Sequence, residues 1–266
     1  MLTMGVDIGS TASKAVIIRD GEELIAHRLI PLGTGTRGPE EVYEQTLSDA
    51  GVSREELDRV IVTGYGRLNF THADKQISEV SCHARGVRFL LPTVRTVIDI
   101  GGQDIKAMRI GPQGQLANFV MNDKCAAGTG RFLDVMARVL DVQTEDLGEI
   151  SSHSTKAISI SNTCTVFAES EVISRLSDKV DISDIVAGIH SSVAKRVAGL
   201  ALRVGVDGGD VAMSGGVALN KGVVHAMEQE LQKPILVHEH CQLAGAVGAA
   251  MFAYDQLIKE QAKANA

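Results

Sequence analysis

Asp7-Ile8-Gly9-Ser10-Thr11-Ala12-Ser13-Lys14 and Asp99-Ile100-Gly101-Gly102-Gln103-Asp104-Ile105-Lys106 share one pattern: Asp-Ile-Gly, four further residues and then Lys. The two copies begin 92 residues apart (99 − 7), and each lies between two stretches with the composition of β-strands. A pattern that recurs together with its flanking strands is typical of an internal duplication. We therefore expect two related lobes, each built on a strand-turn-strand unit.

The expected elements follow this repeat. The first half predicts strands over Thr3–Ile8, Lys14–Arg19, Glu23–Ile30 and Arg59–Thr63 and helices over Pro39–Ala50 and Ser78–Leu90. The second half predicts strands over Thr96–Ile100, Asp104–Ile110, Gln115–Met121, Asp210–Ser214 and Ile235–His238, and helices over Arg131–Leu140, Thr144–Leu147, Thr165–Ser177, Ser183–Val204, Lys221–Leu231 and Leu243–Ala262. The prediction is an α/β fold with lobes at 1–93 and 94–242, and with the closing helix 243–266 packing on the first lobe.

Composition narrows the class of protein. Of the 266 residues, 44% are apolar and 22% charged, and 26 basic against 33 acidic side chains give a net charge of −7. This balance argues against a nucleic-acid or anionic-membrane surface. Met1–Asp7 lacks the profile of a signal peptide, and the weakly polar run Leu243–Tyr254 is too short to span a bilayer. With four cysteines and no disulfide pattern, we expect a cytoplasmic protein with reduced thiols.

The two turns have the chemistry of phosphate loops. Glycine lets backbone N–H groups approach an anion, hydroxyl and lysine side chains add donors, and Asp7 and Asp99 can hold Mg²⁺ directly or through water. A single such turn would more often be an ordinary hairpin turn, but two at matching places favour a polyphosphate site. The predicted nucleotide-binding residues of the turns are Gly9, Ser10, Thr11, Ser13, Lys14, Gly101, Gly102, Gln103 and Lys106.

A third segment, Val211–Asn220, ends a predicted strand at Gly215-Gly216 and leads into a helix at Lys221. Its two glycines can let a nucleoside lie against the backbone, although a plain strand-to-helix connection explains the segment equally well by itself. Asp7, Asp99 and Gln103 are the candidate catalytic residues. Gln103 and Asp104 can orient the attacking water, or serve only the turn.

Two cysteines precede predicted helices. Cys125 lies in Met121–Leu140, ahead of an apolar stripe at helical spacing, and Cys164 follows the capping run Ser161-Asn162-Thr163. We expect both thiols to lie among helix N–H groups without intrahelical partners, where a thiolate or an anionic ligand is favoured. Two thiols are too few for most metal centres, but two copies of the chain bring four. The alternative is that each Cys is a small buried apolar residue.

Other polar residues have ordinary explanations. His238, His240 and Cys241 invite a zinc site, but strand alternation places Cys241 off the face of the two histidines, and a second ligand pair is absent from the sequence nearby. Glu169 and Glu171 are interpreted as first-turn acids of the helix after Cys164.

The three glycine segments together resemble the ATP site of the superfamily that contains acetate and sugar kinases, heat-shock chaperones and actin. By this resemblance, Asp7–Lys14 is the first phosphate loop, Asp99–Lys106 the second, and Ser214–Val217 the adenosine loop. The resemblance implies two duplicated ribonuclease-H-like lobes, an actin-like ATPase fold, with a nucleotide cleft between them.

A narrower resemblance covers essentially the whole chain. The segments that carry it are Asp7–Lys14, Thr63–Arg67, Ala73–Gln76, Asn122–Phe132 and Cys164–Glu171, which are similar to signatures of the activators of (R)-2-hydroxyacyl-CoA dehydratases. That family implies a homodimeric ATPase with one [4Fe–4S] cluster bridging the subunits, ligated by Cys125 and Cys164 of each chain. It also implies that ATP hydrolysis drives one low-potential electron, supplied by ferredoxin or flavodoxin, onto a partner dehydratase.

Three rival functions remain open at this point. A small-molecule kinase or a chaperone or filament module of the same fold gives no role to Cys125 and Cys164, and either would be colourless when purified without oxygen. An ATPase subunit of a benzoyl-CoA-reductase-type system keeps the chemistry and changes the partner. The partner dehydratase, and not this chain, determines which acyl-CoA is the substrate.

Overall fold

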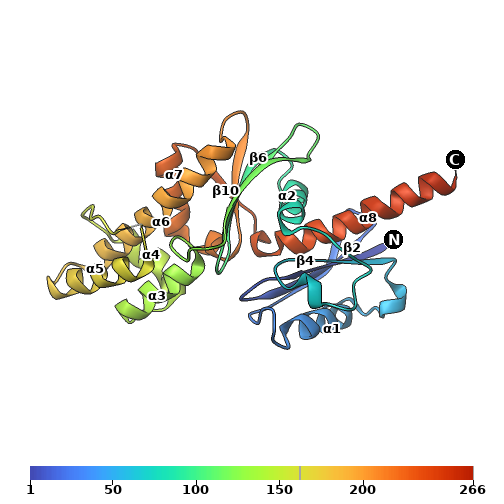
Figure 1. The fold of residues 1–266 in the computed structure, drawn as a ribbon, viewed down its shortest axis with the longest axis horizontal. Helices are drawn as coiled ribbons and strands as arrows, with labels where there is room; N and C mark the ends of the chain where they lie inside the picture. Colours follow the sequence, from blue (N-terminus) through green and yellow to red (C-terminus); the bar gives the residue numbers. More distant parts are fainter. Residues whose placement is uncertain (162, 266) are drawn as a thin grey trace. The chain divides into compact units, whose positions relative to one another are not determined.

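The computed structural model describes residues 1–161 and 163–265, so Asn162 of the predicted capping run and Ala266 lie outside it. The described chain divides into two compact units. Unit 1 comprises residues 1–92, 110–116 and 242–266, and unit 2 comprises residues 93–109 and 117–241. Each unit contains a five-stranded mixed sheet (Figure 1).

The sheet of unit 1 has the strand order β3-β2-β1-β4-β5. β1 pairs antiparallel with β2 and parallel with β4, so the first phosphate loop is the turn between two central strands. The elements of this unit are β1 Leu2–Ile8, β2 Ser13–Arg19, β3 Glu23–Ile30, α1 Gly38–Ala50, η1 Arg54–Glu56, β4 Arg59–Thr63, η2 Arg67–Asn69, β5 Lys75–Gln76, α2 Glu79–Leu90 and α8 Ala244–Ala264.

Helices cover both faces of this sheet, which is why β1 is buried along almost its whole length. Val42 and Tyr43 of α1 pack with Met4 and Val6 on one face, and Val247 of α8 packs on the opposite face (Figure 1). The strand and α8 approach each other closely at Gly5, where a Cβ would lie 1.9 Å from the carbonyl oxygen of Ala246.

α2 and α8 cross at a similarly close distance. A Cβ on Gly86 would lie 1.8 Å from the Ala244 carbonyl oxygen, and one on Gly248 would lie 1.8 Å from the Cys82 carbonyl oxygen. Only glycine permits this approach of two helix backbones. The crossing therefore holds α2 and α8 together as one pair within unit 1.

The sheet of unit 2 has the order β10-β9-β6-β7-β8, which repeats the antiparallel pair and the parallel neighbour of unit 1. Its elements are β6 Val94–Ile100, β7 Ile105–Ile110, β8 Leu116–Asn122, α3 Gly130–Leu140, η3 Thr144–Asp146, α4 Leu147–Ser152, α5 Thr165–Ser177, α6 Ile182–Val204, β9 Asp210–Ser214, η4 Gly216–Leu219, α7 Lys221–Leu231, β10 Ile235–Val237 and η5 Cys241–Leu243.

α6 is the central helix of unit 2, and α3, α4, α5 and α7 pack around it (Figure 1). Among the helices of the described residues, only α6 is long and apolar enough to cross a membrane by length and composition. Its apolar side chains, Ile185, Ile189 and Val193 among them, are buried in the core of the unit. The apolar character of α6 is thus accounted for by packing within the protein.

The duplication extends beyond the two turns. Asp7 of β1 lies in register with Thr63 of β4, and Asp99 of β6 lies in register with Ser214 of β9. Each hydroxyl residue is followed by a glycine with positive φ, +90° at Gly64 and +84° at Gly215. The loop that follows Thr63 is therefore the counterpart of the predicted adenosine loop.

Four local predictions differ from the structure. Glu169 and Glu171 lie beyond the first turn of α5, which begins at Thr165, so they are not first-turn acids. The helix expected at Thr144–Leu147 is a 3-10 turn, after which α4 runs over Leu147–Ser152. The two-residue strand β5 was not predicted, because so short a strand has no periodicity. The last strand ends at Val237, so strand alternation does not apply to the histidines, and the His240 N–H donates to His238 Nδ1 at 3.0 Å in a turn.

Candidate functional site

The first phosphate loop is a tight turn at the end of β1. The Gly9 N–H donates to the Ala12 carbonyl at 3.0 Å, which leaves Ser10 and Thr11 at the tip. Lys14 Nζ lies 3.4 Å from Asp7 Oδ2 across the strand pair. Ser13 is buried and its hydroxyl donates to the Leu32 carbonyl at 2.8 Å, so this predicted phosphate donor is used inside the unit.

Two further glycine loops support this turn. The Thr34 N–H donates to the Gly9 carbonyl at 2.9 Å, and a Cβ on Gly33 would lie 2.2 Å from the Ser10 carbonyl oxygen. On the other side, the Gly66 N–H donates to the Ile8 carbonyl at 2.9 Å. The contacts of both loops with the turn assign them to its support.

Asp7 is 2% exposed and has one carboxylate oxygen, Oδ1, that receives no hydrogen bond from any described residue. The Thr63 hydroxyl, in register beside it, makes no hydrogen bond to Asp7. Oδ2 faces α8 and α2, since a Cβ on Gly245 would lie 2.8 Å from it and 2.9 Å from His83 Nε2. Sequence reasoning missed Thr63 and His83, which strand register and helix packing bring to Asp7.

The second phosphate loop is more fully bonded. Lys106 is 1% exposed, and its Nζ lies 3.2 Å from Asp99 Oδ2 and 2.6 Å from Asp104 Oδ2. The Ser214 hydroxyl donates to Asp99 Oδ1 at 2.7 Å. Asp104 thus balances Lys106, and the exposed Gln103 remains as the side chain at the tip of the loop.

The adenosine loop begins directly after Ser214. The Gly215 N–H donates to the Cys241 carbonyl at 3.1 Å, and a Cβ on Gly215 would lie 2.4 Å from the Ile100 carbonyl oxygen. Gly216 is exposed at the start of η4. Both predicted glycines therefore lie in a connection that packs closely on the end of β6, beside the second phosphate loop.

The four thiols fall into two groups. Cys82 and Cys241 are buried, and burial raises the pKa of Cys82 to about 12, so that this thiol stays protonated. Cys125 and Cys164 are partly exposed and both lie in unit 2. Cys164 is the N-cap residue of α5, and the described residues supply no partner for the first α5 amides, at Thr165, Val166 and Phe167.

The expectation for Cys125 was wrong in one respect. α3 begins at Gly130, five residues after Cys125, and its first amides are already bonded. Those of Gly130 and Arg131 donate to the carbonyls of Gly101 and Gly102, each at 2.9 Å. Long-range contacts with the second phosphate loop satisfy the start of this helix, and no local sequence signal indicates them.

One chain does not supply the full donor set of a four-cysteine centre. A [4Fe–4S] cluster takes four cysteine thiolates, and one chain offers two accessible thiols. Within residues 1–161 and 163–265, no group of three or more His, Cys, Asp or Glu side chains is placed to hold a metal ion. A second copy of the chain would supply the missing pair.

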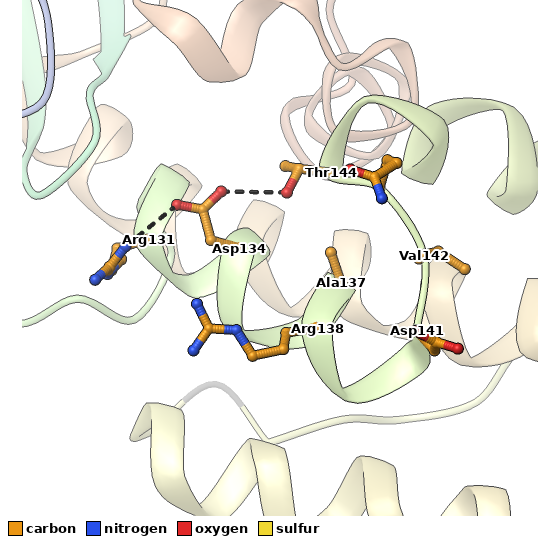
Figure 2. A pocket seen from close by; sticks show the side chains of 8 residues that line it. Arg131, Asp134, Ala137, Arg138, Asp141, Val142 and Thr144 are labelled. Atoms are coloured by element: carbon orange, nitrogen blue, oxygen red, sulfur yellow. Dashed lines mark hydrogen bonds and ion pairs between the residues drawn. The ribbon is translucent and has the colours of Figure 1, made fainter. Parts of the chain in front are cut away.

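An open pocket between α3 and the segment that follows it contains none of the predicted nucleotide ligands or cysteines. Figure 2 shows Asp134 between Arg131 and Thr144; it lies 3.9 Å from Arg131 and accepts a hydrogen bond from the Thr144 hydroxyl at 3.2 Å. Its lining residues are Arg131, Asp134, Ala137, Arg138, Asp141, Val142, Gln143 and Thr144.

Residues 4–253 match the sequence profile of the BadF/BadG/BcrA/BcrD ATPase family. The chain belongs to this family. It is 57% identical over 261 residues to the 2-hydroxyisocaproyl-CoA dehydratase activator of Clostridioides difficile, covering 98% of both chains. It is 54% identical over 258 residues to the (R)-2-hydroxyglutaryl-CoA dehydratase activating ATPase of Acidaminococcus fermentans, covering 97% of this chain and 98% of that one.

Solved structures agree with this family assignment. The structure of the activator of the 2-hydroxyisocaproyl-CoA dehydratase from Clostridium difficile with bound ADPNP superposes with a TM-score of 0.94 at 57% identity, covering 99% of this chain and 98% of that one. A ROK family glucokinase from Streptomyces griseus, at 15% identity and a TM-score of 0.60 over 96% of this chain and 100% of that one, shares the fold alone. The predicted actin-like ATPase fold is confirmed.

Proposed function

We propose that this chain is the ATP-dependent activator of an (R)-2-hydroxyacyl-CoA dehydratase. In this proposal it works as a homodimer that shares one [4Fe–4S] cluster through Cys125 and Cys164 of each copy. The observation that carries it is the separation of the four thiols: two are buried, and the two accessible ones lie in the unit that contains the second phosphate loop. The activators from Clostridioides difficile and Acidaminococcus fermentans support the assignment along the full length.

The exposed apolar side chains near the cysteines support the dimer. Phe119 and Met121 of β8 precede Cys125 and are 50% and 39% exposed, and Val166 and Phe167 follow Cys164 and are 58% and 65% exposed. Apolar surface of this kind is typical of a surface that a protein partner covers. A second copy placed there would bring its own pair of thiols to the same region.

The reaction divides between the cofactor and the chain. Cys125 and Cys164 of each copy would hold the cluster, which would supply one-electron transfer from ferredoxin or flavodoxin to the dehydratase. In unit 1 the Asp7–Lys14 loop binds phosphate of Mg·ATP and Asp7 balances the charge of the metal. In unit 2 the Asp99–Lys106 loop binds phosphate and Gly215-Gly216 lies against the nucleoside. Gln103, exposed at the tip of its loop, orients water toward the γ-phosphate, so that ATP and water yield ADP and phosphate. We place the protein in the cytoplasm, where these thiols stay reduced.

An ATPase component of a benzoyl-CoA-reductase-type system is the alternative. One component of the benzoyl-CoA reductase of Thauera aromatica is 33% identical over 261 residues, covering 94% of this chain and 92% of that one. The two activators are much more similar, at 57% and 54%. The dehydratase is therefore the preferred partner.

Anaerobic purification tests the proposal. The wild-type protein is expected to be brown and dimeric, with about four iron and four sulfide ions per dimer. Cys125→Ser and Cys164→Ser are each expected to lose the iron, whereas Cys82→Ser and Cys241→Ser serve as buried controls and keep it. Iron that survives both ligand substitutions, or a colourless wild-type protein, contradicts the proposal. Assays with purified dehydratases and benzoyl-CoA reductase then identify the partner.

A further inference from the structure

The start of α3 is bonded to the second phosphate loop by the backbone. The Gly130 and Arg131 amides donate to the Gly101 and Gly102 carbonyls, each at 2.9 Å. The next two amides, of Phe132 and Leu133, donate to the Thr129 carbonyl at 3.1 and 3.4 Å. Thr129 is the N-cap residue, but its side chain makes no capping bond. The Gly101 and Gly102 carbonyls therefore accept hydrogen bonds from the α3 amides in place of a capping side chain.

Gly130, the first residue of α3, also lies close to the adenosine loop. A Cβ on Gly130 would lie 3.3 Å from the Gly101 carbonyl oxygen, 3.4 Å from Gly102 Cα and 3.6 Å from Val217 Cγ2. Val217 belongs to η4, directly after Gly215-Gly216. The first residue of α3 thus lies against both candidate nucleotide loops of unit 2.

The segment from Cys125 to Gly130 is a closed turn. The Thr129 N–H and hydroxyl both donate to the Ala126 carbonyl, at 3.0 and 2.7 Å, and Asn122 Nδ2 donates to the Cys125 carbonyl at 3.3 Å. Thr129 is fully buried. Because these bonds fix the turn, a displacement of Gly130 is passed on to Cys125.

The N–H groups of the second phosphate loop that face a phosphate and the carbonyls that bond α3 belong to the same peptide groups. The Gly101 carbonyl and the Gly102 N–H belong to one rigid peptide group, as do the Gly102 carbonyl and the Gln103 N–H. A phosphate that accepts from these N–H groups polarises the same units whose oxygens hold α3, and it can rotate them. Phosphate binding at the loop then changes the hydrogen bonds at the start of α3.

We infer that Gly130 is a positioning residue, and that the pair of bonds from Gly130 and Arg131 to the second phosphate loop, here called the backbone clip, transmits the nucleotide state to Cys125. The inference rests on the proposed function and adds to it the path from ATP to the cluster thiol. α3 also packs against α5, with Phe132 and Leu133 in one core with Ala168 and Val172. Cys164, the N-cap residue of α5, lies at the end of the same chain of contacts.

Gly130→Pro tests the clip with a matched control. Proline suits the first position of a helix, and Thr129 before it has the extended backbone, φ −96° and ψ 175°, that a residue before proline adopts. Proline removes the Gly130 N–H, and its ring pushes the Gly101 carbonyl away. Gly130→Ala adds a Cβ and keeps the N–H, so it controls for bulk.

The readout is alkylation of Cys125 in the anaerobic, iron-free chain, followed by peptide mass spectrometry with and without Mg·ADP or a non-hydrolysable ATP analogue. We expect the nucleotide to change the Cys125 rate by about fivefold or more in the wild type and in Gly130→Ala. In Gly130→Pro, we expect nucleotide binding to persist by calorimetry while the Cys125 rate no longer responds. An unchanged response in Gly130→Pro, or no response in the wild type, overturns the inference.

If Gly130→Pro does not fold, hydrogen exchange of the Gly130 and Arg131 amides in the wild type decides the matter. The clip requires their protection to change on adding Mg·ADP, and unchanged protection overturns it. Neither measurement needs iron. The clip can therefore fail while the cluster assignment stands, and loss of the cluster assignment in the cysteine variants leaves the clip measurable.

Discussion

The Ser214 hydroxyl donates to Asp99 Oδ1 at 2.7 Å, whereas Thr63, in the matching register beside Asp7, makes no such bond. Both oxygens of Asp99 are thereby engaged, one by Ser214 and the other by Lys106. Asp7 keeps one buried oxygen that no described residue bonds. A buried acceptor without a donor is costly and is typical of a site that a ligand completes. Of the two duplicated aspartates, Asp7 therefore retains an oxygen that can bind a ligand, whereas both oxygens of Asp99 are already bonded.

This difference predicts unequal effects of two matched substitutions. Asp7→Asn is expected to remove most of the gain in ADP affinity that Mg²⁺ provides, as measured by calorimetry with and without Mg²⁺. Asp99→Asn leaves the buried Lys106 without one of its counter-charges and is expected to cost about 3–5 kcal/mol of folding free energy, while the ratio of the two affinities is retained. Equal loss of the Mg²⁺ effect in both variants would contradict the division.

The acid stability of unit 2 is predicted to depend on His190. Burial lowers the pKa of His190 to about 4 from its ordinary value of 6.5. Because the folded-state pKa lies below the unfolded-state value, unfolding takes up a proton in this range. The stabilisation is complete above pH 6.5 and is lost as the pH falls towards 4, by about 3 kcal/mol in total.

Denaturant titrations between pH 7 and 4 measure this loss. His190→Gln is expected to flatten the pH dependence, since an amide oxygen can still accept from Asn220 Nδ2, which lies 3.3 Å from His190 Nε2. His225→Gln, at an exposed site on α7, is the control and is expected to leave the curve unchanged. A curve of the same slope in His190→Gln would assign the acid sensitivity to other groups.

The α2–α8 crossing predicts a strong effect of one added methyl group. Gly86→Ala places a Cβ 1.8 Å from the Ala244 carbonyl oxygen, and the two helices must separate to accept it. We expect a loss of about 3 kcal/mol, measured by thermal or denaturant unfolding. Gly199→Ala in α6 meets nothing within 4 Å and is the matched control, with an expected gain of about 0.5–1 kcal/mol. Similar values for the two variants would exclude the close crossing.

The thiols are predicted to react in two classes. Iron-free protein treated with a maleimide at neutral pH is expected to label quickly at Cys125 and Cys164, which are partly exposed. Cys82, with its pKa raised to about 12, and the buried Cys241 are expected to label only after unfolding. Peptide mass spectrometry over time distinguishes the sites. Rapid labelling of Cys82 in the folded protein would be inconsistent with the buried crossing of α2 and α8.

Much of the fold follows from local sequence. The strands around Asp7 and Asp99 have clear alternation, their turns carry glycine at the required places, and the helices have periodic apolar stripes, so most element limits were predicted within a few residues. The helix expected from Thr144 failed because its first turn is 3-10, which local propensity does not separate from an α-helical start.

The site was less accessible to sequence reasoning, because its decisive contacts are long-range. Thr63 reaches Asp7 only through the parallel pairing of β1 and β4, which lie far apart in the chain. Lys106 was assigned to phosphate, and only the fold shows its Nζ within 2.6 Å of Asp104. The repeat alone does not give this contact, because Thr63 follows Asp7 by 56 residues (63 − 7) and Ser214 follows Asp99 by 115 (214 − 99). Only the strand register shows that Thr63-Gly64 and Ser214-Gly215 are equivalent.

The backbone clip also bears on the order in which unit 2 folds. The strands β6 and β7 are joined by a four-residue turn, Gly101–Asp104, so this hairpin closes a much shorter loop than the contact between Gly101 and Gly130. Without that hairpin, two of the four leading amides of α3 lack their acceptors, and helix nucleation is already unfavourable. The loop that carries Cys125 therefore acquires its shape only after the β6–β7 hairpin has formed, which makes the order of folding within unit 2 a condition for a well-placed thiol.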